Sequence, residues 1–225
     1  MPDIHHIVHK NYSFASDRLL SNTSLDKLID IFRSNPGHGT HMLEGRIPPQ
    51  FLILPETGSI VIKSYQRGGW MARINKDRYL NTGQIRSKRE FDFLIAAEKA
   101  GITVPLPVAY ASVGFPFYKT WLILKEVKEH RSFVRVCLED RKRALGFLPE
   151  ISNAINRLIK HNIQHVDLHP GNILLNGDNK IYIIDFDKAR YWSKSKSRLK
   201  KSYHQRWGRA VQKYKLPEEI SALDL

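Results

Sequence analysis

The stretch His-Val-Asp-Leu-His-Pro-Gly-Asn at residues 165–172, followed by Asp-Phe-Asp at 185–187, decides how the rest of the chain is interpreted. Phosphoryl transfer needs a carboxylate that orients the attacking hydroxyl, and it needs oxygen ligands that hold Mg²⁺ against the nucleotide phosphates. Asp167 fits the first task, and Asn172 and Asp185 fit the second. The two motifs together predict an enzyme that uses ATP and Mg²⁺.

The residues between the motifs predict a β-hairpin that brings Asn172 and Asp185 together. Residues 173–175 and 181–184 are short apolar, β-prone runs, and Asn-Gly-Asp-Asn at 176–179 separates them. The alternative is a loop whose Asp and Asn side chains only satisfy turn backbones, which is their usual role. Two linked motifs with a hairpin between them favour the catalytic interpretation, because kinases use this spacing.

Composition limits the class of protein more than its chemistry. The chain of 225 residues is long enough for one large domain or two small lobes, and 42% hydrophobic residues is ordinary for a soluble globular protein. The net charge of +14 predicts attraction to polyanions. Nucleic acid, an anionic membrane surface and a phosphorylated or carboxylated substrate all fit this charge.

The remaining bulk features indicate a cytoplasmic protein. A single cysteine, Cys137, excludes an internal disulfide and fits a reducing compartment. Residues 1–11 lack the basic-then-apolar layout of a signal peptide. No apolar run is long enough to span a bilayer, so we expect any membrane contact to be peripheral.

The N-terminal half offers candidate nucleotide contacts. A helix is predicted over residues 25–32, with Ser24 as its N-cap. Gly37 and Gly39 then lie two residues apart, a spacing that lets a backbone approach phosphate closely. A Pro-Gly turn without a ligand has the same spacing, so both interpretations stay open.

A hairpin is predicted over residues 51–65, and its return strand carries Val61-Ile62-Lys63. This resembles the kinase strand whose lysine contacts the α- and β-phosphates. A helix predicted over residues 86–100 places Glu90 at the edge of its apolar stripe, so Glu90 can face the lysine. A solvent-facing glutamate is the ordinary alternative, but the downstream motifs favour a Lys63–Glu90 ion pair.

The middle of the chain supplies a connection and a supporting helix. Within the run 117–126, a buried strand is predicted over residues 120–124. It is followed by Glu126 and Val127, where a kinase joins its two lobes and backbone groups meet the adenine edge. By position alone, Glu126 and Val127 are candidate nucleotide contacts. A helix predicted over residues 141–161 leads to His165, which we interpret as a structural histidine rather than the base.

The end of the chain departs from the protein-kinase pattern. Asp187 replaces the glycine that usually follows Asp-Phe, and His169 stands where a lysine is usual. The residues after Asp187 leave no room for a long activation segment, which favours a small or lipid-linked acceptor. Residues 188–215 are rich in Lys and Arg, interleaved with aromatic residues, and suit an anionic membrane interface, nucleic acid or a solvated helix face.

We therefore expect an α+β chain with a protein-kinase-like two-lobed fold and a reduced C-terminal helical lobe. Residues 1–225 would form a single kinase-like domain. Residues from about 1 to 126 would be the N-lobe, with an antiparallel sheet and one main helix, and about 127 to 225 the helical C-lobe with the catalytic loop.

The chain closely resembles the 3-deoxy-D-manno-octulosonic acid (Kdo) kinases of Gram-negative lipopolysaccharide synthesis. The resemblance spans about residues 37–215, and its motifs are the following: Tyr65–Gly69, Asp77–Tyr79, Arg89–Phe91, Val104–Pro107, His165–Asn172 and Asp185–Asp187. The His-x-Asp-Leu-His-Pro-x-Asn element is shared with many small-molecule kinases. The Arg-Gly-Gly and Asp-Arg-Tyr stretches make the resemblance specific.

The resemblance implies ATP-dependent phosphorylation of the 4-hydroxyl of a Kdo residue on the lipid A precursor, Kdo-lipid IVA. It implies work at the cytoplasmic face of the inner membrane, with the anionic membrane surface as a partner and no nucleic acid. Arg67, Arg73 and Arg78, in an insertion that ordinary protein kinases do not need, are candidates for gripping the anionic acceptor, or else belong to a tolerated surface loop.

Two alternatives stay open. One is a kinase for another sugar, such as a heptose or an aminoglycoside-like compound. The other is a catalytically inactive basic module that binds nucleic acid or membrane. The presence of both Asn172 and Asp185 argues against the inactive module.

Overall fold

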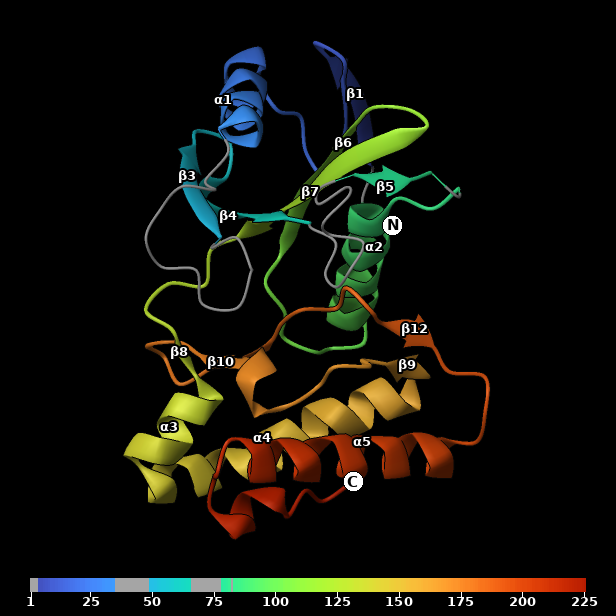
Figure 1. Ribbon diagram of the computed structural model, residues 1–225. Coiled ribbons are helices and arrows are strands. Elements are labelled where there is room, and N and C mark those ends of the chain that lie inside the picture. Colours follow the sequence, from blue (N-terminus) through green and yellow to red (C-terminus); the bar gives the residue numbers. More distant parts are fainter. Residues whose placement is uncertain (1–3, 35–48, 66–77, 82) are drawn as a thin grey trace. The chain divides into compact units, whose positions relative to one another are not determined.

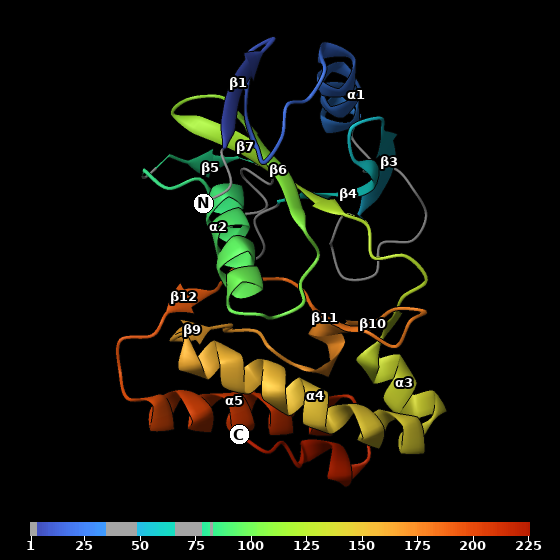
Figure 2. The same ribbon diagram turned by 180° about the vertical axis from the view of Figure 1, so that it is seen from behind.

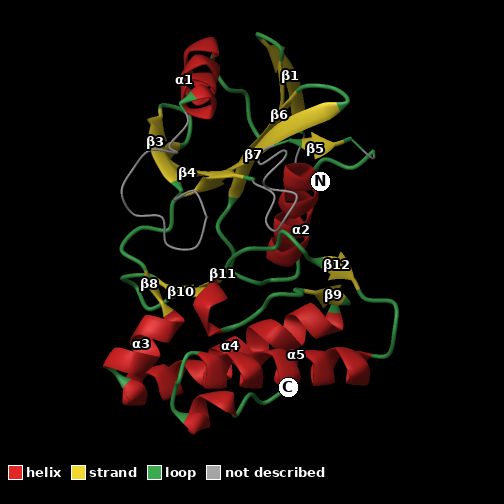
Figure 3. Ribbon diagram, in the orientation of Figure 1, coloured by secondary structure: helices red, strands yellow, loops and turns green. Residues whose placement is uncertain are grey.

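The computed structural model describes residues 4–34, 49–65, 78–81 and 83–225. Gly37, Gly39, Arg67 and Arg73 therefore lie outside the described residues. The chain divides into two compact units, Met1–Phe91 with Leu106–Glu126 and Asp92–Pro105 with Val127–Leu225. Both units combine helices with antiparallel strands (Figures 1 and 3), as the sequence predicts for an α+β chain.

The first unit is built on an antiparallel sheet in the order β1-β2-β6-β7-β4-β3, with β5 paired to β7. The strands and helices of this unit are the following: β1 His5–His9, β2 Tyr12–Ser16, α1 Asn22–Arg33, β3 Gln50–Leu54, β4 Gly58–Ser64, β5 Tyr79–Leu80, α2 Arg86–Lys99, β6 Pro107–Val113 and β7 Phe117–Lys125. The predicted hairpin appears as β3 and β4, and the predicted helix over 86–100 appears as α2. The boundary between the units falls within α2.

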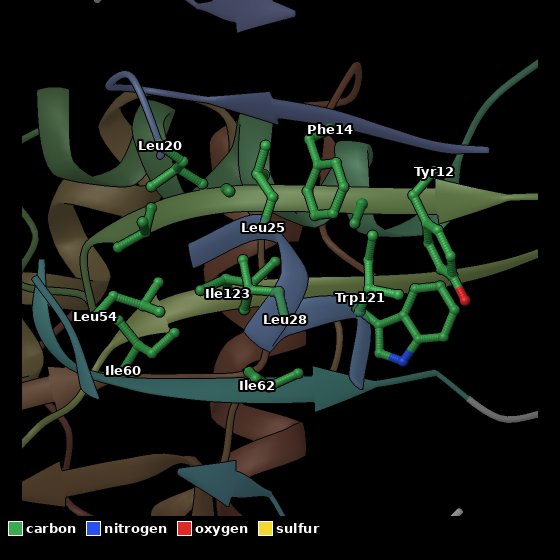
Figure 4. Close-up of a cluster of buried hydrophobic side chains, with 14 residues drawn as sticks. Tyr12, Phe14, Leu20, Leu25, Leu28, Leu54, Ile60, Ile62, Trp121 and Ile123 are labelled. Carbon is green, nitrogen blue, oxygen red and sulfur yellow. The ribbon is translucent and has the colours of Figure 1, made fainter. Parts of the chain in front are cut away.

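Side-chain alternation gives the two faces of this sheet different tasks. On one face, Ile62, Trp121 and Ile123 pack with Leu25 and Leu28 of α1 in a continuous apolar cluster (Figure 4). Neighbouring residues point to the opposite face, because successive side chains of a strand alternate. There Thr120 bonds to Ser87 and Tyr110 packs edge-on against Phe91, both from the start of α2. The sheet therefore presents its second face, including Lys63, to α2.

The start of α1 corrects the predicted cap. The N-cap is Ser21 rather than Ser24, because the Ser21 hydroxyl accepts a hydrogen bond from the Ser24 N–H at 3.2 Å. The Glu56 carboxylate fixes this end by accepting from the Ser21 N–H at 2.9 Å and from the Ser24 hydroxyl at 2.7 Å. Hydrogen bonding with Ser21 is the main cause that lowers the pKa of Glu56 to about 2, and the Ser24 hydrogen bond also contributes. The apolar periodicity begins at Leu25 and so points to the wrong serine.

The second unit contains the longest helices of the described chain and two small sheets (Figure 2). Its elements are the following: β8 Arg131–Ser132, α3 Phe133–Glu139, α4 Arg141–Lys160, β9 Ile163–Gln164, the 3₁₀ turn Pro170–Asn172, β10 Ile173–Leu175, β11 Ile181–Ile183, β12 Arg190–Tyr191, α5 Lys196–Lys213 and the 3₁₀ turn Glu218–Ser221. Residues 92–105 group with this unit, because Thr103 accepts from the Ile183 N–H at 3.0 Å and Gly101 accepts from Arg157 at 2.7 Å.

The predicted hairpin around the motifs is confirmed. Strand β10 pairs with β11 in the register Ile173 to Ile183 and Leu175 to Ile181. The turn closes as the Asn176 N–H donates to the Lys180 carbonyl at 3.1 Å, and Asn179 takes a positive φ of 61°. Asn tolerates this left-handed conformation better than most residues, which explains its use in the turn.

Helix α5 uses part of the basic, aromatic tail as core. Tyr203 and Trp207 are fully buried, so these two aromatics are not available to a membrane or to bases. The Trp207 ring N–H donates to the Ile220 carbonyl at 2.7 Å, and the Tyr203 hydroxyl donates to the Ile163 carbonyl at 2.9 Å. Figures 1 and 2 both show α5 beside α4. None of the described helices has both the length and the apolar character that crossing a bilayer would require.

Candidate active site

The predicted ion pair between Lys63 and Glu90 is confirmed. The Lys63 ammonium, at the end of β4, lies 2.9 Å and 2.8 Å from the two carboxylate oxygens of Glu90. Glu90 is only 1% exposed, whereas the Lys63 side chain is about a third exposed. Burying a carboxylate this deeply is costly unless it is paired and hydrogen-bonded, and Lys63 provides both.

Two tyrosines and an arginine surround this pair, and sequence reasoning missed all three. The Tyr65 hydroxyl donates to the Glu90 carboxylate. The Arg86 guanidinium lies over the rings of Tyr65 and Tyr79, 5.3 Å from each centroid, and donates to the Tyr79 hydroxyl at 2.6 Å. The missed signal was alternation, because Tyr65 stands two residues after Lys63 and so faces the same side of the strand.

The loop at residues 165–172 holds its own backbone in place. The Asn172 N–H donates to the His169 carbonyl at 2.8 Å, and the Gly171 N–H donates to His169 Nδ1 at 3.0 Å. The Asn172 amide nitrogen donates to the Asp167 carbonyl at 3.0 Å. This last bond fixes the orientation of the Asn172 carboxamide, so that its oxygen points away from the loop backbone.

Asn172 and Asp185 are brought together by the hairpin. Asn172 lies just before β10, and its carbonyl accepts from the Ile184 N–H at 3.0 Å, which extends the ladder by one step. Asp185 is the next residue and has a φ of 67°, a left-handed conformation that Asp tolerates better than most residues with a Cβ and that often marks functional positions. The backbone therefore turns sharply where the second motif begins.

The donor set fits Mg²⁺. A carboxamide oxygen and a carboxylate are hard oxygen ligands, and Mg²⁺ is commonly held by one or two protein ligands together with water and phosphate oxygens. The described residues contain no group of three or more His, Cys, Asp or Glu side chains that could hold a metal without such partners. The site accordingly suits a cation delivered with a nucleotide better than a structural metal.

Asp167 is held by two cations that the sequence did not identify. Lys188 contacts Oδ2 at 2.9 Å, and Arg206, from α5, donates to Oδ1 at 2.8 Å. Partial burial acts to raise the pKa of Asp167, but Lys188 and Arg206 outweigh it, so the pKa lies below its ordinary value. Asp167 is therefore a carboxylate near neutral pH. A carboxylate of low pKa is a weak base. It mainly orients the attacking hydroxyl and takes the proton only late in the transfer.

His165 has the structural position that the sequence predicts. It is fully buried, its Nε2 lies 2.9 Å from the Ile184 carbonyl, and its N–H donates to the Tyr203 hydroxyl at 2.8 Å. Burial lowers the pKa of its imidazole. The His165 and Phe186 rings pack edge to face, with 4.5 Å between their centroids. His165 therefore connects the loop at residues 165–172 with the Asp-Phe-Asp motif.

Glu126 and Val127 follow β7, and part of their backbone is already used. The Glu126 N–H donates to the Ser59 carbonyl at 3.2 Å, and the Val127 carbonyl accepts from His130. The Glu126 carbonyl and the Val127 N–H make no hydrogen bond within the part of the chain that the structure describes. These two groups belong to one trans peptide and point in opposite directions. They cannot both face one adenine edge, so a purine contact here needs a further group.

Comparisons with known proteins identify a family model and several relatives that this chain resembles. The family model described as lipopolysaccharide kinase (Kdo/WaaP) family matches residues 41–218. A protein of Vibrio parahaemolyticus named 3-deoxy-D-manno-octulosonic acid kinase is 32% identical over 154 residues, which are 67% of this chain and 64% of the relative. A protein of the same name from Xylella fastidiosa strain 9a5c is 29% identical over 155 residues, or 68% of this chain and 62% of the relative. The match thus spans slightly less than two thirds of these relatives' length.

Proposed function

Because the chain belongs to the lipopolysaccharide kinase (Kdo/WaaP) family, we propose that it transfers the γ-phosphate of ATP to the 4-hydroxyl of a Kdo residue on a lipid A precursor, Kdo-lipid IVA. The observation that carries the proposal is the joining of Asp167, Asn172 and Asp185 through one loop and one hairpin. We also propose a protein-kinase-like two-lobed fold, with an N-lobe over about residues 1–126 and a reduced helical C-lobe over about 127–225.

In this proposal each residue has a defined task. Asp167 accepts the hydrogen bond of the attacking hydroxyl and takes its proton as the new bond to the γ-phosphorus forms and the bond from this phosphorus to the bridging oxygen of the leaving ADP breaks. Lys63, oriented by Glu90, binds the α- and β-phosphates. Asn172 and Asp185 hold Mg²⁺, which neutralises the charge of the phosphates. Glu126 and Val127 stay candidates for the adenine contact, which would use either the Glu126 carbonyl or the Val127 N–H.

The charge of the chain supports an anionic acceptor. A Kdo-bearing lipid carries carboxylate and phosphate groups, and the net charge of +14 favours approach to it and to an anionic membrane. We propose that the protein acts as a peripheral protein at the cytoplasmic face of the inner membrane.

A surface patch of the first unit supports this location. Phe115 lies at the turn between β6 and β7 and is 82% exposed, and Phe117 and Leu80 are neighbours across the β5–β7 pair, each about half exposed. Arg78 and Lys119 flank the patch, and residues 78–81 and 113–119 contain no acidic side chain. Exposed aromatics beside cations are typical of segments that enter an anionic lipid interface. We propose that this patch, the Phe115 turn, inserts into the anionic lipid surface.

The test of the proposed reaction is transfer of label from γ-labelled ATP with Mg²⁺. Kdo-lipid IVA should be labelled, and the same precursor without Kdo should not. Mass spectrometry and NMR of the product should place the phosphate on the 4-hydroxyl. Asp167→Asn should lower the rate by about 10²- to 10⁴-fold while nucleotide binding and folding stay unchanged. Labelling of a heptose instead of Kdo would retain the kinase and reject the acceptor.

A further inference from the structure

We propose that Lys188 binds the transferred phosphoryl group of ATP, and so supplies the positive charge that protein kinases place two residues after the catalytic Asp. In this chain that position is His169. The inference rests on the proposed kinase function and assigns its phosphate-binding cation. The loop at residues 165–172 precedes the β10–β11 hairpin, whereas Lys188 follows it. Lys188 nevertheless contacts Asp167 of that loop.

The position of Lys188 joins the two groups between which phosphate must pass. Its ammonium lies 2.9 Å from Asp167 Oδ2, where the attacking hydroxyl is oriented in the proposed reaction. It stands three residues after Asp185, the proposed metal ligand. In an in-line transfer the γ-phosphoryl group lies between the nucleophile and the metal-bound nucleotide. A cation anchored at this point meets the phosphoryl oxygens, where charge is spread in the transition state.

His169 is already used by the loop itself. Its Nδ1 accepts the hydrogen bond of the Gly171 N–H at 3.0 Å, so its ring is held against the loop backbone. The ring also packs against Tyr214, with 5.7 Å between centroids. His169 is therefore committed to capping the 3₁₀ turn that presents Asn172, which explains why the cation has to come from elsewhere.

The arrangement of charges around Asp167 allows Lys188 to turn toward a phosphate. One carboxylate faces two cations, so Arg206 still holds Oδ1 of Asp167 when Lys188 turns from Oδ2 to a phosphate. The Lys188 side chain is 63% exposed, against 38% for Arg206, so its long stem is free to rotate in solvent. We assign Arg206 as the positioning residue of Asp167, whereas Lys188 contacts the nucleotide.

The test compares two nucleotides in the absence of any acceptor. The binding of Mg²⁺ with ADP, and of Mg²⁺ with the non-hydrolysable ATP analogue AMP-PNP, is measured by titration calorimetry for the wild type and for Lys188→Met. A charge-assisted hydrogen bond to the γ-phosphate corresponds to about 10- to 100-fold in affinity. We expect Lys188→Met to weaken AMP-PNP by this factor and ADP by less than about threefold, since ADP lacks the γ-phosphate.

Three further variants separate phosphate binding from support of Asp167. Arg206→Met should slow transfer but leave the ratio of the two affinities unchanged, because the Arg206 guanidinium donates to Asp167 Oδ1. Lys200→Met, an exposed lysine of α5, removes the same charge and should change neither quantity. Lys188→Arg should recover part of the AMP-PNP affinity.

Equal weakening of both nucleotides by Lys188→Met, or no weakening of either, would overturn the inference. A wild-type protein that binds neither nucleotide would overturn it together with the proposed kinase function. Selective loss of AMP-PNP binding, with no labelling of Kdo-lipid IVA, would support Lys188 and reject only the acceptor.

Discussion

Replacing Lys63 by Met isolates the energy of the buried ion pair. The Lys63 ammonium lies 2.8 Å from a Glu90 oxygen, and at this distance the attraction is about 6 kcal/mol at an effective dielectric of about 20. Partial exposure of Lys63 reduces this value. Loss of one partner of a buried pair typically costs about 3–5 kcal/mol, because the remaining charge stays buried with weaker compensation. We expect Lys63→Met to lower the free energy of unfolding by about 3 kcal/mol.

The double variant Lys63→Met/Glu90→Gln is the matched control. It removes the Glu90 charge together with the Lys63 charge, and it keeps an acceptor for the Tyr65 hydroxyl. Replacing both members of a buried pair is often close to neutral, so we expect the double variant within about 1 kcal/mol of the wild type. Neither variant should transfer phosphate at the wild-type rate, since both lack the phosphate-binding lysine of the proposal.

Urea denaturation at neutral pH and titration with Mg²⁺–ATP measure the two effects separately. The reasoning would be refuted if the double variant were as unstable as the single one, because the cost would then come from lost packing rather than from the loss of a cation beside a buried carboxylate. Wild-type transfer rates in the stable double variant would reject the role of Lys63 in nucleotide binding.

Three other predictions follow from the geometry. Asp185→Asn should raise the Mg²⁺ concentration needed for half-maximal transfer by at least about tenfold without changing stability, and an unchanged metal requirement would count against the ligand assignment. Because the pKa of Glu56 falls from 4.5 to about 2 on folding, its contribution to stability is complete above about pH 4.5 and is lost as the pH falls through about 2. Glu56→Gln should therefore flatten acid denaturation over this interval, as followed by circular dichroism, and an unaltered profile would reject its link to α1. Phe115→Ser should weaken binding to phosphatidylglycerol vesicles by about 10- to 100-fold, whereas Phe51→Ser, at an exposed position of β3, should not; equal effects would exclude the Phe115 turn as the membrane contact.

The sequence predicted those parts of the fold that depend on local patterns. The β10–β11 hairpin follows from two apolar runs around an Asn-rich turn, and α2 follows from three-and-four spacing with a glycine at its end. The Lys63–Glu90 pair was predictable because alternation on a strand and periodicity on a helix both limit where a side chain points. In each case a few adjacent residues determine the outcome.

Features that join distant segments were not predictable from the same patterns. The cap of α1 depends on Glu56, which lies 35 residues after Ser21 in the chain. The burial of Tyr203 and Trp207 depends on packing with Phe133 and with the Ile163 and Ile220 backbone, so the same aromatic spacing served an interface interpretation equally well. Spacing shows that a helix has an aromatic face, but it does not show what that face contacts.

The two cations beside Asp167 could not be identified from the sequence motif. The motif shows where the reactive side chains lie in the chain, but it does not show which charges surround them. The motif places a carboxylate, an amide and a second carboxylate, and each is recognised from its neighbours in the chain. Lys188 and Arg206 lie in a segment so rich in Lys and Arg that no single cation is distinguished by sequence. Only the three-dimensional contacts select two of them, one on each oxygen of Asp167. Part of the strongly basic charge of this chain therefore acts at the site of the proposed reaction. There Lys188 and Arg206 lower the pKa of Asp167, and in our proposal Lys188 also binds the phosphoryl group that is transferred.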